Sequence, residues 1–136
     1  MQHLKILFLT MSIVIVKSAL TPKDLLNLQM SLGKCRSNNQ VDSSLISQAL
    51  RGQMVNNHEF DCFIACILQG IGVTSEDGSL NADTAVDKIP ESLQSRDVII
   101  NAIRSCSSRK GSDKCQTAHL LFECMHEKNV PNILMG

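Results

Sequence analysis

Six cysteines carry most of the chemistry that this sequence offers. They are Cys35, Cys62, Cys66, Cys106, Cys115 and Cys124, and the gaps between them hold 26, 3, 39, 8 and 8 residues. Thiols can form disulfides, bind a metal or act as nucleophiles. An even number of cysteines in a short chain favours a disulfide framework, for which fifteen pairings exist. The Cys-x-x-Cys spacing of zinc sites is absent, so we expect three disulfides, no metal and no cofactor.

Helical geometry limits the pairings without choosing one. Cys62 and Cys66 are four residues apart, so on a helix they lie on nearly the same face. They are better placed to join that helix to two neighbours than to bond each other. Cys115 and Cys124 are nine residues apart, which at about 100° per residue places them on opposite faces of a helix. We expect them to reach two different partner helices.

Three histidines lie beyond the first few residues of the chain. We expect His58 and His126 at the surface. His119 shares a stretch with Ala118 and Phe122, which makes it a candidate for the wall of an apolar pocket. There its ring could hydrogen-bond an alcohol, aldehyde or ester oxygen. The alternative is a partly exposed histidine at the edge of the pocket.

The sequence lacks the motifs of the common secreted enzymes. His58-Glu59-Phe60-Asp61 has no second histidine at the zinc-protease spacing, and no Gly-x-Ser-x-Gly occurs. The acids between Ser75 and Asp83 do not have the EF-hand spacing, so we interpret this stretch as a polar turn. We therefore expect a protein that is not an enzyme.

The first residues have the layout of a secretory signal peptide. A short polar start is followed by the apolar stretch 6–16 and then by small residues. The stretch is too short for a membrane anchor, which needs about 20 apolar residues. We predict a signal over 1–18, cleaved after Ser18 or Ala19, and one secreted, extracellular domain over 19–136. With 13 basic and 13 acidic residues, the chain favours neither nucleic acid nor stable membrane insertion, and it specifies no oligomeric state.

Apolar residues at helical spacing, separated by caps and breakers, predict an all-α fold of about six helices. Alternating strand patterns and Asn-Gly hairpin signals are lacking. The expected helices run from a Thr21 cap toward Cys35, from an Asp42 cap to Gly52, from an Asn57 cap to Gly70, from Asn81 to Ile89, from Pro90 to Ser107, and from a Ser112 or Asp113 cap to about Lys128.

The order of cysteine gaps, with 3 residues in the second gap and 8 in the last, resembles that of insect odorant- and pheromone-binding proteins. The segments Gly72-Val73 and Gly78-Ser79-Leu80-Asn81 resemble the family's turn after the third helix, and Cys115-Gln116-Thr117-Ala118 resembles the start of its last helix. One departure is His119, where the family often has a large aromatic residue. The resemblance implies the pairs Cys35–Cys66, Cys62–Cys115 and Cys106–Cys124.

The resemblance also implies a function. It indicates a compact helical bundle around an apolar cavity, which carries odorants, pheromones or similar small hydrophobic molecules through extracellular fluid, with an odorant receptor as a further candidate partner. Disulfides, each contributing about 2–4 kcal/mol, can offset the cost of such a cavity. The runner-up is a helical signalling or interaction protein with a solid core.

The candidate pocket is built from apolar residues of the later helices and of the tail that follows them. Because the chain has no Trp or Tyr and only 4 Phe, we expect medium-length aliphatic ligands with one polar group. We expect Ile133 and Leu134 to fold over the pocket as a lid, with a disordered end as the alternative. The complete set of candidate ligand-binding residues is Leu68, Ile71, Leu80, Ala85, Ile89, Leu93, Ile99, Ala102, Ile103, Ala118, His119, Phe122, Ile133 and Leu134.

Overall fold

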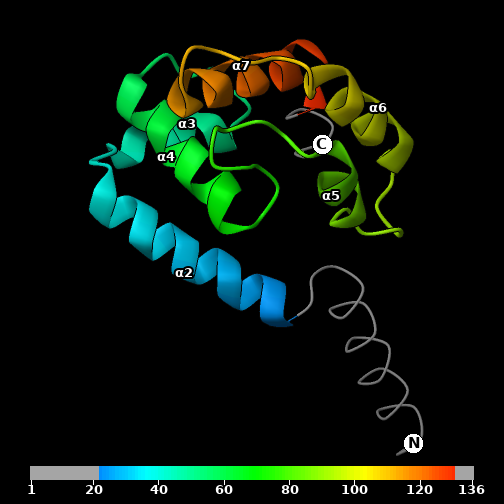
Figure 1. The fold of residues 1–136 in the computed structure, drawn as a ribbon, viewed down its shortest axis with the longest axis horizontal. Helices are drawn as coiled ribbons and strands as arrows, with labels where there is room; N and C mark the ends of the chain where they lie inside the picture. Colours follow the sequence, from blue (N-terminus) through cyan, green and yellow to red (C-terminus); the bar gives the residue numbers. More distant parts are fainter. Residues whose placement is uncertain (1–21, 131–136) are drawn as a thin grey trace, which may run out of the picture.

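The computed structural model describes residues 22–130, and this part of the chain is helical (Figure 1). The expected all-α fold is confirmed. The signal segment and the tail positions Ile133 and Leu134 lie outside the described residues. The helices are α2 (Pro22–Asn38), α3 (Ser43–Leu50), α4 (His58–Gly70), α5 (Ala82–Asp87), α6 (Arg96–Cys106) and α7 (Lys114–Glu127).

Side-chain caps fix where four of these helices begin. The first amide groups of a helix have no partner within it, and an Asp or Asn oxygen that accepts from one of them contributes about 1 kcal/mol. The predicted caps at Asp42 and Asn57 are confirmed, and Asp113 rather than Ser112 caps the last helix. Asn81, which was expected as the first residue of its helix, caps α5. Taken in chain order, the side-chain oxygens of the four caps accept from the backbone N–H groups of Ser44, Phe60, Thr84 and Gln116.

The fifth predicted helix begins later than its sequence indicates. Pro90 is a good first residue for a helix, but α6 starts only at Arg96. Between them, the Leu93 N–H donates to the Pro90 carbonyl and the Arg96 N–H to the Leu93 carbonyl, which makes tight turns in place of a continuous helix. Ser95 then adopts a left-handed backbone with φ of 67°, which an α-helix cannot include. The expectation of a helix over Pro90–Ser107 is therefore wrong for its first third, residues 90–95.

The three disulfides join helices that pack against each other. Helix α4 packs against α2 and α7, and α6 packs against α5 and α7. The bonds are Cys35–Cys66 between α2 and α4, Cys62–Cys115 between α4 and α7, and Cys106–Cys124 between α6 and α7. This is the pairing that the family resemblance implies. As helical geometry predicts, Cys115 and Cys124 bond to two different helices.

Helix α2 carries apolar residues that the described part of the chain does not cover. Its buried positions are Ser31 and Cys35, whereas Leu25 is 47% and Met30 65% exposed. The helix runs along one side of the molecule, with its N-terminal half beyond the end of α4 (Figure 1). One disulfide joins this helix to α4, and among the described residues the helix lines no part of the cavity described below.

The loop between α4 and α5 is held in a defined shape. Thr74 and Leu80 form an isolated antiparallel bridge, and the Asn81 N–H donates to the Val73 carbonyl over 2.8 Å. At the tip, the Asp77 carboxylate accepts from the Ser79 N–H and from the Lys110 ammonium, the latter over 2.7 Å. These contacts tie the loop to the segment before α7.

Gly78 brings the same loop close to α7. Its φ of 88° is left-handed, and a Cβ at this position would lie 2.9 Å from Lys114 Cα. Only glycine fits such a backbone against a neighbouring main chain without strain. The loop, with the apolar side chains on either side of its tip, is therefore fixed against the start of α7.

Candidate ligand cavity

An apolar cavity of about 240 Å³ lies between α4, α5, α6, α7 and the loop that follows α4. Among the described residues, every side chain that lines it is apolar or belongs to a disulfide. They are Ile64, Leu68, Val73, Leu80, Ala85, Ile103, Cys106, Ala118, Leu121, Phe122 and Met125.

Helical periodicity explains how α7 forms the largest part of the wall. Ala118, Leu121, Phe122 and Met125 follow one another at intervals of i, i+3, i+4 and i+7, which places all four on one face. Opposite them, α4 contributes Ile64 and Leu68, one turn apart. Two antiparallel apolar stripes thus face each other across the cavity, and the other elements complete its wall.

The Cys106–Cys124 disulfide is part of the wall itself. Cys106 lines the cavity at the end of α6, and both cysteines are buried, with exposed fractions of 0% and 2%. The bond fixes the end of α6 to the last turn of α7. It therefore resists the inward movement of α6 that would close the cavity.

Six of the predicted ligand-binding residues line this cavity: Leu68, Leu80, Ala85, Ile103, Ala118 and Phe122. Four others do not line it. Ile99 and Ala102 are buried in a cluster that also contains the lining residue Ile103, and Ile89 and Leu93 pack against this cluster. Ile71 is the half-buried residue that ends α4. Because α6 has apolar residues both at the cavity and in this cluster, the spacing of its apolar residues alone does not show which of them face the cavity.

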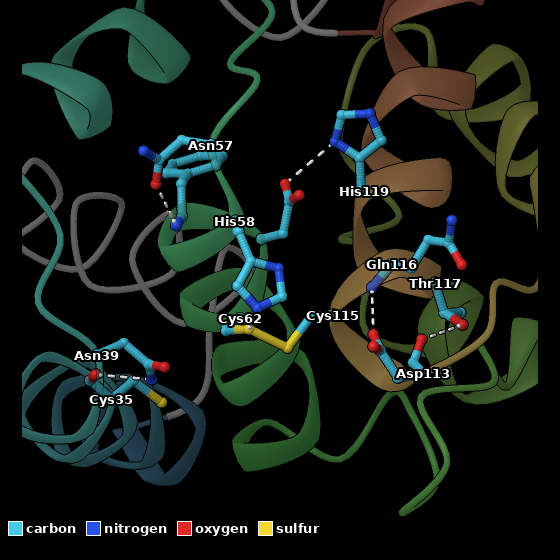
Figure 2. Close-up of a disulfide and its surroundings, with 12 residues drawn as sticks. Cys35, Asn39, Asn57, His58, Cys62, Asp113, Cys115, Gln116, Thr117 and His119 are labelled. Carbon is cyan, nitrogen blue, oxygen red and sulfur yellow. Dashed lines mark hydrogen bonds and ion pairs between the residues drawn. A yellow bond between two sulfur atoms is a disulfide. The ribbon is translucent and has the colours of Figure 1, made fainter.

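His119 lies outside the cavity. It is one residue, or about 100°, beyond Ala118 on α7, so it faces a polar hollow near the start of α4 (Figure 2). Its Nδ1 lies 3.1 Å from Asp61 Oδ1, and its Nε2 lies 3.7 Å from a carboxylate oxygen of Glu123. In this structure His119 makes a polar link between α7 and α4, and its role in hydrogen-bonding a ligand stays a prediction.

The link places a carboxylate in a partly dry environment. Asp61 and His119 side chains are 15% and 21% exposed, respectively. Burial raises the pKa of Asp61 above its ordinary value, and the hydrogen bond with His119 acts in the opposite direction. The other two histidines, His58 and His126, are exposed as expected.

Five lining residues were missed from the sequence: Ile64, Val73, Cys106, Leu121 and Met125. Three could have been found from spacing, because Ile64 is one turn before Leu68, and Leu121 and Met125 share a face with Ala118. Val73 had no such signal, since the folded loop brings it to the wall. A cavity of this kind can bind an apolar molecule by surface burial and offers no group for catalysis.

Comparisons with known proteins agree with this architecture. The model of the PBP/GOBP family matches residues 17–128 of the chain. General odorant-binding protein 19d of Drosophila melanogaster is 19% identical over 134 residues, with 93% of this chain and 89% of that protein covered.

Two solved structures share the fold. The odorant-binding protein lmigOBP1 of Locusta migratoria is 19% identical and superposes with a TM-score of 0.71, covering 85% of this chain and 91% of that one. Odorant Binding Protein 7 of Anopheles gambiae, which has four disulfide bridges and was solved with an azo compound, is 22% identical with a TM-score of 0.65, covering 79% and 89%.

The fold and the cavity define a helical binding protein held by disulfides. The chain belongs to the PBP/GOBP family, the insect odorant-binding proteins. Members of this family bind small hydrophobic ligands, are not enzymes and are generally secreted. Within residues 22–130, none of the helices is long and apolar enough to cross a membrane.

Proposed function

We propose that this protein is a secreted carrier that holds a small aliphatic molecule in the cavity between α4 and α7. The observation that carries the proposal is the wholly apolar lining of a space of about 240 Å³. A signalling protein with a solid core would have no use for such a space. The apolar surface around a space of this size gains free energy when an apolar ligand covers it.

The size of the cavity indicates the size of the ligand. A dry cavity of about 150 Å³ lined by Leu, Ile and Phe binds benzene, and this one is larger. A flexible chain of about ten carbons buries about 0.8 kcal/mol per methylene, or about 8 kcal/mol before the costs of association. That energy corresponds to a Kd near 1 µM as the tight limit.

The chemistry of the lining indicates which polar group the ligand carries. No lining side chain among the described residues donates or accepts a strong hydrogen bond. An unpaired buried hydroxyl costs about 1–3 kcal/mol, and an unpaired ionised carboxylate costs more. Alcohols, aldehydes and esters of medium length are therefore the ligand class, and ionised fatty acids are excluded from it.

The proposal includes secretion through a signal over 1–18 and delivery of the ligand through extracellular fluid, with an odorant receptor as the candidate recipient. The support is the sequence pattern of the signal segment and the family's general mode of action. N-terminal sequencing of the protein secreted by insect cells tests the first part, with Ala19 or Leu20 as the expected first residue. A chain that begins at Met1 would contradict it.

Displacement of a lipophilic fluorescent probe, N-phenyl-1-naphthylamine, tests the ligand class, with binding of the probe itself measured first. Decan-1-ol and decyl acetate should displace the probe at micromolar concentrations, and decanoate at pH 7 should be at least about tenfold weaker. Pyrene, a rigid polycycle, should also be weaker. No probe binding would support the solid-core alternative, and a preference for decanoate or pyrene would contradict the ligand class.

A further inference from the structure

The Cys62–Cys115 disulfide differs from the other two in its surroundings. The ring of His58, which lines the polar hollow, stands directly beside it (Figure 2). His58 Nε2 is 3.6 Å from Cys62 Sγ, one helical turn away, and this contact is exposed. His58, Cys62 and Cys115 bring three potential metal-ligand atoms together. The two sulfurs are already bonded to each other, however, and a metal needs a thiolate.

We propose that Cys62 is a site of thiol–disulfide exchange, at which a low-molecular-weight thiol opens the Cys62–Cys115 bond. The thiolate attacks Cys62 Sγ, and a new S–S bond forms between the two. The bond to Cys115 breaks, and its electron pair leaves on Cys115 Sγ. The product carries a mixed disulfide on Cys62 and a free thiolate on Cys115. A second thiolate can release Cys62 as well, and the two thiols are then oxidised to their own disulfide.

The direction of attack follows from burial. Cys62 is half-buried, whereas Cys115 is 9% exposed. An incoming thiol therefore reaches Cys62 first, beside the ring of His58. In the tautomer that carries a proton on Nε2, that ring directs an N–H toward the sulfur and attracts the anionic nucleophile.

The leaving sulfur is also placed favourably. Cys115 is the second residue of α7, where backbone amides are unpaired and a helix N-terminus stabilises a thiolate. The carboxylates of Asp61 and Asp113 face the same hollow and oppose a negatively charged thiol. The Asp113 carboxylate accepts from the Gln116 N–H, and the Asp61 carboxylate is paired with His119. Because these carboxylates oppose further negative charge, we expect a thiol whose only charge is that of its thiolate to react best.

The Cys106–Cys124 disulfide is shielded from this reaction. Cys106 and Cys124 are 0% and 2% exposed, so a thiol reaches neither sulfur without opening α6 from α7. Cys35 is 1% exposed, and its partner Cys66 is half-buried on the face of α4 that α2 covers. Since Cys62 is half-buried as well, the preference for the Cys62–Cys115 bond over this one rests on His58, which lies beside Cys62 Sγ.

Brief exposure of the folded protein to 2-mercaptoethanol, followed by iodoacetamide and peptide mass mapping, tests the proposal. The first product should carry mercaptoethanol on Cys62 and carbamidomethyl on Cys115, with the other two disulfides intact. His58→Gln should slow this opening about three- to tenfold, because the variant lacks the ring that lies beside Cys62 Sγ. His126→Gln, at another exposed histidine, is the control and should leave the rate unchanged.

Three results would overturn the proposal. They are earlier opening of Cys35–Cys66 or Cys106–Cys124, simultaneous opening of all three bonds at the rate of global unfolding, and a first adduct on Cys115 with Cys62 free. An equal rate of opening in wild type and His58→Gln would show that His58 does not assist the exchange. Circular dichroism of both variants before treatment ensures that the comparison is between folded proteins.

Discussion

The ring of Phe122 meets the ring of Phe60 edge to face, with centroids 5.8 Å apart and planes at 75°. Phe122 lines the cavity, and Phe60 is buried in the core at 1% exposure. The pair therefore connects a wall of the cavity to the buried core. Such pairs contribute about 0.5–1.5 kcal/mol beyond the burial of their area.

Phe122→Ala should destabilise the fold by about 3–5 kcal/mol, because it removes the ring pair and enlarges an existing cavity. Urea unfolding followed by circular dichroism measures the change. Leu50→Ala, at a side chain that is 63% exposed, is the control and should stay within about 0.5 kcal/mol of wild type. A loss below about 1 kcal/mol in Phe122→Ala would mean that the ring does not support the wall.

Replacement of two glycines by alanine should have opposite effects. Gly78→Ala places a Cβ against the Lys114 backbone at positive φ, so it should lower the free energy of unfolding by more than about 1 kcal/mol. Gly33→Ala, inside α2 with nothing within 4 Å of the added Cβ, should raise it by about 0.5–1 kcal/mol. Thermal unfolding of the two variants distinguishes them. A harmless Gly78→Ala would show that the loop is not fixed against α7.

Asp77 and Asp61 should affect acid stability in opposite directions. The hydrogen bond from Lys110 holds the pKa of Asp77 well below its ordinary 3.8. Its contribution is therefore present above pH 3.8 and is lost as the pH falls through the folded pKa. Asp77→Asn should be less stable than wild type at pH 6, and the difference should shrink toward pH 2.

Burial instead raises the pKa of Asp61 above 3.8. Protonation then favours the folded state, so the contribution of this group is complete below pH 3.8 and is lost as the pH rises through its folded value. Asp61→Asn should therefore gain stability relative to wild type as the pH rises through this window. Thermal unfolding from pH 2 to pH 7 measures both variants, and parallel pH profiles for the two would contradict these assignments.

The tail is predicted to cover the cavity, although Ile133 and Leu134 lie outside the described residues. Val130, which leads into it, is 3% exposed and belongs to the cluster with Ile99 and Ile103. A truncation should therefore keep Val130 and remove 131–136. If the tail is a lid, this truncation should speed both uptake and release of the probe in stopped-flow experiments. Unchanged rates at pH 7 and pH 5 would favour a disordered end.

The sequence predicted the elements better than their environment. Caps such as Asn57 depend on local hydrogen bonds, so helix starts could be predicted from the sequence. The cysteine gaps reflect distances between helices, so they indicated the disulfide framework. Which neighbour a helical face meets depends on tertiary packing. For that reason Ile99 was assigned to the cavity although it lies in the cluster beside it, and Met125 was missed. His119 shows the same limit, since one residue of rotation on α7 separates the apolar wall from the polar hollow.

The central claim, that the ligand occupies the cavity between α4 and α7, is tested most directly by filling it. Ala85 lines the cavity, and Ala85→Phe places a ring in a space of about 240 Å³. Ala49→Phe makes the same change on α3, away from the cavity, and is the matched control. The measurement is the Kd of decan-1-ol by probe displacement, for variants whose circular dichroism matches wild type. The account predicts at least tenfold weaker binding in Ala85→Phe and unchanged binding in Ala49→Phe, and wild-type affinity in Ala85→Phe would contradict it.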